Sequence, residues 1–137
     1  MAALDTNVWV RFLVQDDAAQ GAAATRLIRA GVESGSALFV PVTVMLELEW
    51  VLRTAFGFEK TAVILALFGL LGSYELAFES EAAVELALAQ FEQTSADFAD
   101  CLHVALAGQA GLQPMWTFDM AAAQLDGAAL LELSVGG

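Results

Sequence analysis

Short apolar runs alternate with longer stretches of helical periodicity along the chain. The short runs have the length of buried strands and occupy residues 2–4, 37–40, 75–78, 114–117 and 129–133. Helical patterns cover residues 7–13, 17–34, 43–56, 59–71, 80–93 and 95–110, and a short turn follows Asp119. Strands that alternate with helices predict an α/β fold whose parallel sheet is covered on both faces.

The chain carries no internal repeat, low-complexity tract or linker that would divide it, and only two prolines interrupt it. Its 137 residues, of which 58% are apolar, suffice to bury one core. We therefore expect a single domain over residues 1–137.

Three features of the sequence bear on the cellular compartment in which the protein works. The apolar run over residues 61–74 is shorter than the roughly 18 residues of a membrane-spanning helix. The segment MAAL before Asp5 lacks the basic start and apolar stretch of a secretory signal. A lone cysteine, Cys101, excludes an internal disulfide or CxxC motif, and we expect it to be a small buried hydrophobe. Together these features predict a cytoplasmic protein.

The charge is strongly acidic, because 17 acids face five bases and give a net charge of -12. All five bases lie in the first 60 residues. A nucleic-acid binder normally shows basic stripes, so this balance by itself argues against such a partner. The objection weakens if several acids surround bound cations, since a divalent ion presents positive charge to phosphate. The positions of the acids therefore decide the question.

Two acids follow predicted strands. Asp5 comes after AAL, and Asp119 comes after MWTF. Ligands of open parallel sheets bind beyond the carboxyl ends of the strands. Taken alone, Asp5 is explained better as a turn or cap residue, and Asp119 is explained equally well as a turn residue. We expect Thr117 to hydrogen-bond the carboxylate of Asp119 or a metal-bound water.

Two further acids, Glu47 and Glu49, lie in one predicted helix and cannot share a face, because they are two residues apart. Glu49 stands four residues before Arg53, which is the favoured spacing for a solvated ion pair. Glu47 shares a stripe with Val44 and Val51 and has no cation at helical spacing. We therefore assign Glu49 to the surface and Glu47 to the site.

Asp97 and Asp100 are three residues apart, so they project from the same helical face and repel each other unless a cation intervenes. Asp97 lies in the expected first turn, where Thr94 or Ser95 would cap the helix. Asp100 lies deeper and is the better metal ligand, while Asp97 is a candidate for a second metal ion. His103 is the only histidine, and in this apolar helix we expect it to lie in the core or to be partly buried.

An oxygen-only set of ligands suits Mg²⁺ or Mn²⁺, and the lack of a His/Cys cluster argues against zinc. Three tryptophans, Trp9, Trp50 and Trp116, lie near the proposed acids in the sequence. Aromatic residues at such positions more often pack the core than stack on bases, so we expect all three to be core residues.

Four segments resemble, in order and spacing, the blocks of the PIN-domain ribonucleases, in particular the VapC-type toxins of bacterial toxin–antitoxin pairs. They read ALDTNVWVRFLVQDD, VTVMLELEWVLR, ADFADCLHVALA and WTFD, and span nearly the whole chain. The resemblance implies a three-layer α/β/α sandwich with a central parallel sheet. It also implies an Mg²⁺- or Mn²⁺-dependent endoribonuclease in which the metal activates a water for attack on the phosphodiester.

The resemblance assigns roles to particular residues. The family's catalytic, metal-binding acids map onto Asp5, Glu47, Asp100 and Asp119. Residues that would support these ligands or bind a second metal ion are Asp97, Thr6, Asn7 and Thr117. The implied partners are an RNA substrate, a second copy in a homodimer, and a small antitoxin with a basic C-terminal segment. Two departures concern RNA binding: Met120 replaces a frequent basic residue, and no lysine or arginine follows Lys60.

Other folds with a strand-end aspartate fit less well. A haloacid-dehalogenase-type phosphatase needs a second aspartate where Asn7 stands, a receiver domain needs a late lysine, and a Rossmann fold needs GxGxxG. One alternative stays open from the sequence: a catalytically silent PIN-like module that binds a protein partner through its acidic face.

Overall fold

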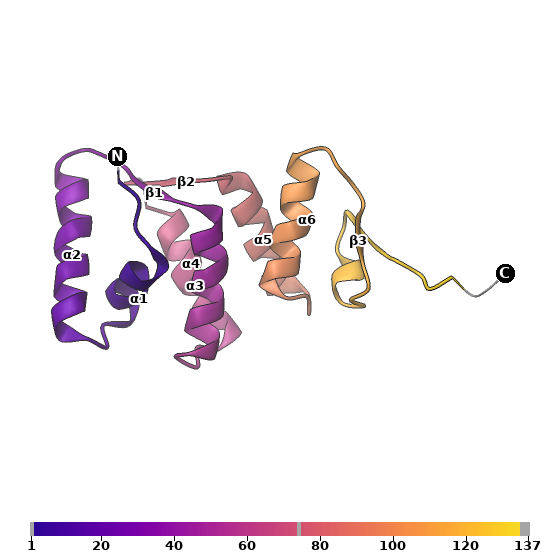
Figure 1. Ribbon diagram of the computed structural model, residues 1–137, viewed down its shortest axis with the longest axis horizontal. Helices are drawn as coiled ribbons and strands as arrows, with labels where there is room; N and C mark the ends of the chain where they lie inside the picture. Colours follow the sequence, from indigo (N-terminus) through magenta and orange to yellow (C-terminus); the bar gives the residue numbers. More distant parts are fainter. Residues whose placement is uncertain (1, 74, 135–137) are drawn as a thin grey trace. The chain divides into compact units, whose positions relative to one another are not determined.

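The computed structural model describes residues 2–73 and 75–134. Its chain divides into two compact units, an N-terminal unit of Met1–Glu81 and a C-terminal unit of Ala82–Gly137 (Figure 1). Tyr74, the end of the apolar run discussed above, lies outside the described residues. The expectation of a single domain stays a prediction, and each unit is described by itself.

The N-terminal unit is mostly helical, with two parallel strands. Its elements are α1 (Thr6–Val14), α2 (Ala18–Glu33), β1 (Leu38–Val40), α3 (Val42–Thr54), α4 (Lys60–Leu71) and β2 (Leu76–Phe78). β1 pairs with β2 in parallel, so that Leu38 lies opposite Leu76. On the other side of β1, Ala3 forms an isolated parallel bridge with Phe39. α2 packs against β1, and α4 packs against β2 (Figure 1).

The helices of this unit begin where the sequence supplies acceptors for free backbone N–H groups. Asp5 caps α1 by accepting a hydrogen bond from the N–H of Thr6 at 2.7 Å. Asp17 caps α2 by accepting from the N–H of Gln20 at 2.9 Å. α2 ends before Gly35, whose φ of +72° is a conformation that glycine adopts without strain. These caps fix the position of Asp5 at the start of α1.

The core of the N-terminal unit is formed by α1, α3, α4 and β1. Its fully buried side chains, all below 2% exposure, are Trp9, Val40, Met45, Leu48, Leu52, Val63 and Leu67. Trp9 is thus a core residue, as predicted, and it packs edge-on against Phe12 with ring centroids 6.2 Å apart. Trp50 was also expected in the core, which is wrong, because it is 57% exposed.

The prediction for Glu49 is half right. It forms the expected ion pair with Arg53, with 2.8 Å between Oε2 and Nε, but Glu49 is buried rather than solvated, at 3% exposure. Met45, Leu48 and Leu52 form the buried side of α3, and Glu49 lies on the same side of the helix. The buried carboxylate is tolerated because Arg53, which is about half exposed, brings its guanidinium to it.

The C-terminal unit contains a second parallel strand pair. Its elements are α5 (Glu81–Gln93, whose first residue belongs to the N-terminal unit), α6 (Phe98–Gln109), β3 (Met115–Thr117), the 3₁₀ turn η1 (Ala122–Gln124) and β4 (Ala128–Leu130). β3 pairs with β4, with Met115 opposite Ala128. α6 packs against β3, and η1 packs against both strands.

α6 begins at Phe98, three residues later than predicted, because Asp97 takes the N-cap position. Thr94, which was expected to cap the helix, instead accepts a hydrogen bond from the N–H of Ala96 at 3.3 Å. Phe98 turns inward and meets Phe91 of α5 at a centroid distance of 5.7 Å. Cys101, three residues after Phe98, is fully buried, so the prediction of a small buried hydrophobe is confirmed.

The predicted α/β class with parallel strands is confirmed. The expected central sheet is represented in the described residues by one parallel pair in each unit. Over residues 2–73 and 75–134, none of the helices has both the length and the apolar character that crossing a membrane requires.

We predict that Arg53→Gln lowers the free energy of unfolding by about 1–3 kcal/mol, because it strands the buried Glu49 carboxylate. Urea unfolding followed by circular dichroism measures the change. Arg26→Gln, at an exposed arginine of α2, removes the same charge and should alter the free energy by less than about 0.5 kcal/mol. Equal effects of the two substitutions would show that the pair contributes no more than a surface charge.

Candidate active site

In the N-terminal unit, Asp5 and Glu47 line the same hollow, which has a volume of about 560 Å³. Asp5 is exposed at the start of α1, and Glu47 is exposed on α3. The capping bond of Asp5 engages its Oδ1 atom. The structure thus brings together the two acids that the sequence assigned to this half of the chain, although Glu47 lies on the exposed side of α3 rather than on the core-facing stripe.

Thr6 adds an unsatisfied oxygen to this hollow. The residue is buried, at 4% exposure, and its Oγ1 atom has no hydrogen-bond partner among the residues that the structure describes. A buried hydroxyl without a partner costs about 1–3 kcal/mol, so it calls for a ligand or an ordered water. Thr6 and the exposed Asn7 both line the hollow, as expected of residues that support the acids.

Arg11 is a residue of this hollow that the sequence reasoning missed. Its guanidinium pairs with Asp16 at 2.9 Å and donates to Oε1 of Gln20 at 2.6 Å. The two contacts hold the positively charged guanidinium of Arg11 on α1, about 1.7 helical turns beyond Asp5. The available signal was its position in the first block, six residues after Asp5, in a chain with only five bases.

In the C-terminal unit, Asp100 lines a smaller hollow of about 120 Å³. Thr117 of β3, His103 of α6 and Trp116 of β3 line it as well. His103, which was expected to lie in the core or to be partly buried, is exposed. Trp116 was expected in the core, which is wrong, because it is 59% exposed. The imidazole of His103 and the indole of Trp116 both contact solvent and line the hollow of Asp100.

The pKa of Asp100 is raised above the ordinary carboxyl value of 3.8. Burial is the main cause, because it disfavours the charged form. The negative charges of Asp119 and Asp97 add to the shift, and His103 opposes it. The structure therefore brings Asp100, Asp119 and Asp97 within electrostatic reach of one another, as the sequence predicted for this half of the site.

Asp119 and Thr117 are held by local hydrogen bonds. Oδ1 of Asp119 accepts from the N–H of Ala122 at 2.8 Å and so fixes the turn into η1. Oγ1 of Thr117 accepts from the N–H of Asp119 at 3.0 Å. The hydroxyl was expected to bond the carboxylate of Asp119 or a metal-bound water, and the observed contact is with the backbone N–H of Asp119. The bond still fixes Asp119 directly after β3.

The donors fit a hard divalent cation, since carboxylate and hydroxyl oxygens are the ligands that Mg²⁺ and Mn²⁺ prefer. The repulsion around Asp100 in the C-terminal unit is a condition that a bound cation would relieve. Within residues 2–73 and 75–134, no three side chains of His, Cys, Asp or Glu lie close enough together to hold a metal ion by themselves.

We predict that Asp100→Asn stabilises the folded protein at neutral pH in EDTA. Because folding raises the pKa of Asp100, its charged form penalises the folded state above the folded pKa, and the penalty disappears below the ordinary value of 3.8. The midpoint of urea unfolding should therefore rise at pH 7 and match the wild type near pH 3. A variant that is destabilised at pH 7 would contradict this account.

Comparison with known proteins identifies the family. No curated protein matches the chain. The family model of the PIN domain matches residues 2–128, which include Asp5, Glu47, Asp100 and Asp119. Because the match covers almost the whole chain, the protein belongs to the PIN-domain family, whose members are typically nucleases and generally use divalent metals.

Proposed function

We propose that the chain is a metal-dependent endoribonuclease. Asp5 and Glu47 of the N-terminal unit and Asp100 and Asp119 of the C-terminal unit would serve as carboxylate ligands. The observation that carries the proposal is the gathering of Asp119 and Asp97 around the partly buried Asp100: burial raises the pKa of Asp100, and the two neighbouring charges raise it further. Without a cation, repulsion between these carboxylates disfavours their charged forms. A bound cation would favour the charged forms and make the carboxylates its ligands.

When bound, Mg²⁺ or Mn²⁺ would polarise the scissile phosphate and make a bound water acidic enough to attack it. The chain's own residues would position these groups. The caps at Asp5 and Asp119 fix the carboxylates at element ends, and Thr117 holds Asp119 through its backbone. Arg11, already oriented by Asp16, supplies a guanidinium for a phosphate of the RNA.

We further propose that this nuclease acts as a VapC-type toxin in the cytoplasm and functions as a homodimer. A small antitoxin with a basic C-terminal segment would neutralise it. The net charge of -12 supports a basic partner. The alternative is a catalytically silent PIN-like module that binds proteins through its acidic face, and the experiment below distinguishes the two.

We predict that the purified chain cleaves single-stranded RNA in Mg²⁺ or Mn²⁺, and that EDTA abolishes cleavage. Asp5→Asn and Asp100→Asn should each lower the rate by about 100-fold or more, because even residues that only support metal ligands contribute 10- to 100-fold. Gel analysis of a labelled RNA, with calorimetric titration of Mn²⁺, measures both properties.

Glu92→Gln, at an exposed acid of α5, is the matched control and should leave the rate unchanged. Saturable Mn²⁺ binding without cleavage of any RNA would favour the silent module. A wild-type chain that neither binds Mn²⁺ nor cleaves RNA would overturn the proposal.

The two glutamates of α3 give a second test. Glu47→Gln should reduce cleavage by about 100-fold at unchanged stability, because Glu47 is exposed beside Asp5. Glu49→Gln should change the unfolding midpoint more than the cleavage rate, because Glu49 is buried with Arg53. Cleavage assays and urea unfolding on the same preparations separate the roles. The reverse pattern would make Glu49 the ligand.

A further inference from the structure

Trp116 is a large aromatic side chain beside the carboxylates of the C-terminal unit. It lies on β3, is 59% exposed, and lines the hollow of about 120 Å³ that Asp100 and Thr117 also line. Burying a tryptophan removes roughly 150–250 Å² of surface from water, so an exposed one forgoes a large apolar contribution to stability. Single exposed apolar residues are common, however, so the surroundings of Trp116 must decide its role.

The neighbours of Trp116 leave its indole ring available. Across the strand pair it lies opposite Ala129 of β4, whose single methyl group covers little of a ring. Two aromatic pairs form among the described residues, one in each unit, and Trp116 belongs to neither. Trp116 can therefore stack on a flat ring that comes from outside the chain.

The charge of the hollow indicates which kind of molecule could bring that ring. Asp119 and Asp97 lie within electrostatic reach of Asp100, so the hollow repels anions as long as no cation is bound. With the proposed divalent ion in place, the same hollow attracts phosphate. A nucleotide carries a phosphate and a flat base in one unit, so it can engage the metal and Trp116 together.

The scarcity of basic residues gives stacking a larger share of RNA affinity. No lysine or arginine follows Lys60, so this part of the chain lacks the side chains that usually neutralise phosphates. Stacking of a base on an aromatic ring needs no positive charge, and it changes affinity about five- to 100-fold per base. An exposed tryptophan thus supplies binding energy that an acidic surface otherwise lacks.

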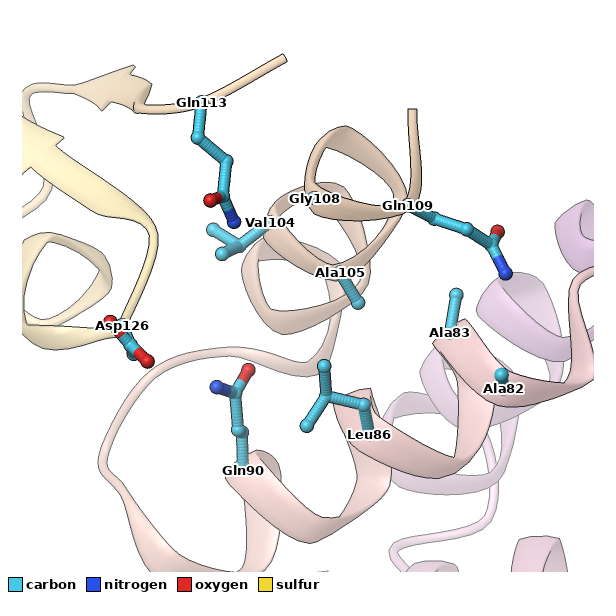
Figure 2. A pocket seen from close by; sticks show the side chains of 10 residues that line it. All are labelled: Ala82, Ala83, Leu86, Gln90, Val104, Ala105, Gly108, Gln109, Gln113 and Asp126. Atoms are coloured by element: carbon cyan, nitrogen blue, oxygen red, sulfur yellow. The ribbon is translucent and has the colours of Figure 1, made fainter. Parts of the chain in front are cut away.

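Two comparisons within the molecule single out Trp116. Trp50 is exposed to nearly the same degree, 57%, but it does not line the hollow of Asp5 and Glu47. The larger pocket between α5 and α6, of about 340 Å³, is drawn in Figure 2, and none of the described residues that line it has an aromatic ring. Of these three places, the hollow of Trp116 combines an exposed ring with a proposed metal ligand.

We propose that Trp116 binds RNA by stacking on the base of a nucleotide next to the scissile phosphate. This inference rests on the proposed nuclease function, because it concerns the same substrate. Stacking tolerates any base, since every base has a π face, but it requires a base that is not paired. Trp116 would therefore select unpaired nucleotides at the position of cleavage.

The first test compares the kinetics of cleavage of a labelled single-stranded RNA in Mg²⁺. Trp116→Leu keeps an apolar side chain but removes the ring, and it should raise KM about five- to 100-fold. It should change kcat little, because the stacking is lost equally from the bound substrate and from the transition state. Trp116→Phe keeps a ring and should retain most of the affinity.

Trp50→Leu is the matched control, because it removes an equally exposed indole that lines neither hollow of proposed ligands. It should leave KM nearly unchanged. Circular dichroism checks that each variant is folded.

An abasic nucleotide in the RNA locates the stacked base. Moved through the positions next to the cut, it should raise the wild-type KM at one position by a factor similar to that of Trp116→Leu. At that position it should raise the KM of Trp116→Leu little further, because both changes remove the same contact. Fully additive effects at every position would contradict a stack between Trp116 and a base.

Tryptophan fluorescence gives a measurement that does not depend on cleavage. Both proteins for this titration carry Glu47→Gln, which is expected to slow cleavage. Adding Trp50→Phe leaves Trp116 as the exposed indole, whereas adding Trp116→Phe leaves Trp50, and Trp9 is buried in both. Single-stranded RNA in Mg²⁺ should quench the Trp116 protein saturably and the Trp50 protein little, and the same RNA in a duplex should quench both little.

The outcomes separate this inference from the nuclease function. If the wild type cleaves RNA but Trp116→Leu and Trp50→Leu affect KM equally, the nuclease stands and the stacking role is overturned. If the wild type cleaves no RNA, the nuclease proposal fails and the fluorescence titration decides the rest. Saturable quenching of Trp116 would then keep it as an RNA-binding residue, and its absence would overturn the stacking role as well.

Discussion

The main constraint on the C-terminal unit is the negative charge of its carboxylates, which no lysine or arginine of the same unit neutralises. Asp100 is partly buried, and Asp119 and Asp97 raise its pKa further. No lysine or arginine follows Lys60 in the sequence, so His103 is the only side chain of this unit that can take up a positive charge. Neutralisation must therefore come from outside the unit. At the hollow that Asp100 lines, the proposed divalent ion would meet this need.

The proposed ligands are also structural residues, and this double use explains their placement. Oδ1 of Asp5 caps α1, and Oδ1 of Asp119 fixes the turn into η1. In each case a backbone N–H orients the carboxylate through one oxygen, which reduces the conformational freedom that a bound metal would otherwise have to remove. A cap requires a non-helical residue at an element end, and the end of a strand is where parallel α/β folds place their ligands.

The sequence predicted the helices and parallel strands well, because apolar periodicity reports burial directly. The sequence-based prediction failed where the partner of a side chain determines whether that side chain is buried. On α3 the spacing of Met45, Leu48 and Leu52 marks the buried side, and this stripe also contains Glu49. The stripe of Val44 and Val51 predicted that Glu47 faces the core, but Glu47 is exposed and lines the hollow of Asp5. The burial of Glu49 depends on Arg53 reaching inward, which spacing alone does not distinguish from a surface pair.

The scarcity of bases bears on how such a chain would hold RNA. Each phosphate neutralised by lysine or arginine contributes to affinity and to its salt dependence. Here all five bases precede residue 61, and Arg11 is the one that lines the hollow of Asp5 and Glu47. Few direct phosphate contacts imply a shallow dependence of binding on salt. Affinity would then rest on the metal and on base contacts, for which Trp116, exposed beside Asp100, offers a stacking surface.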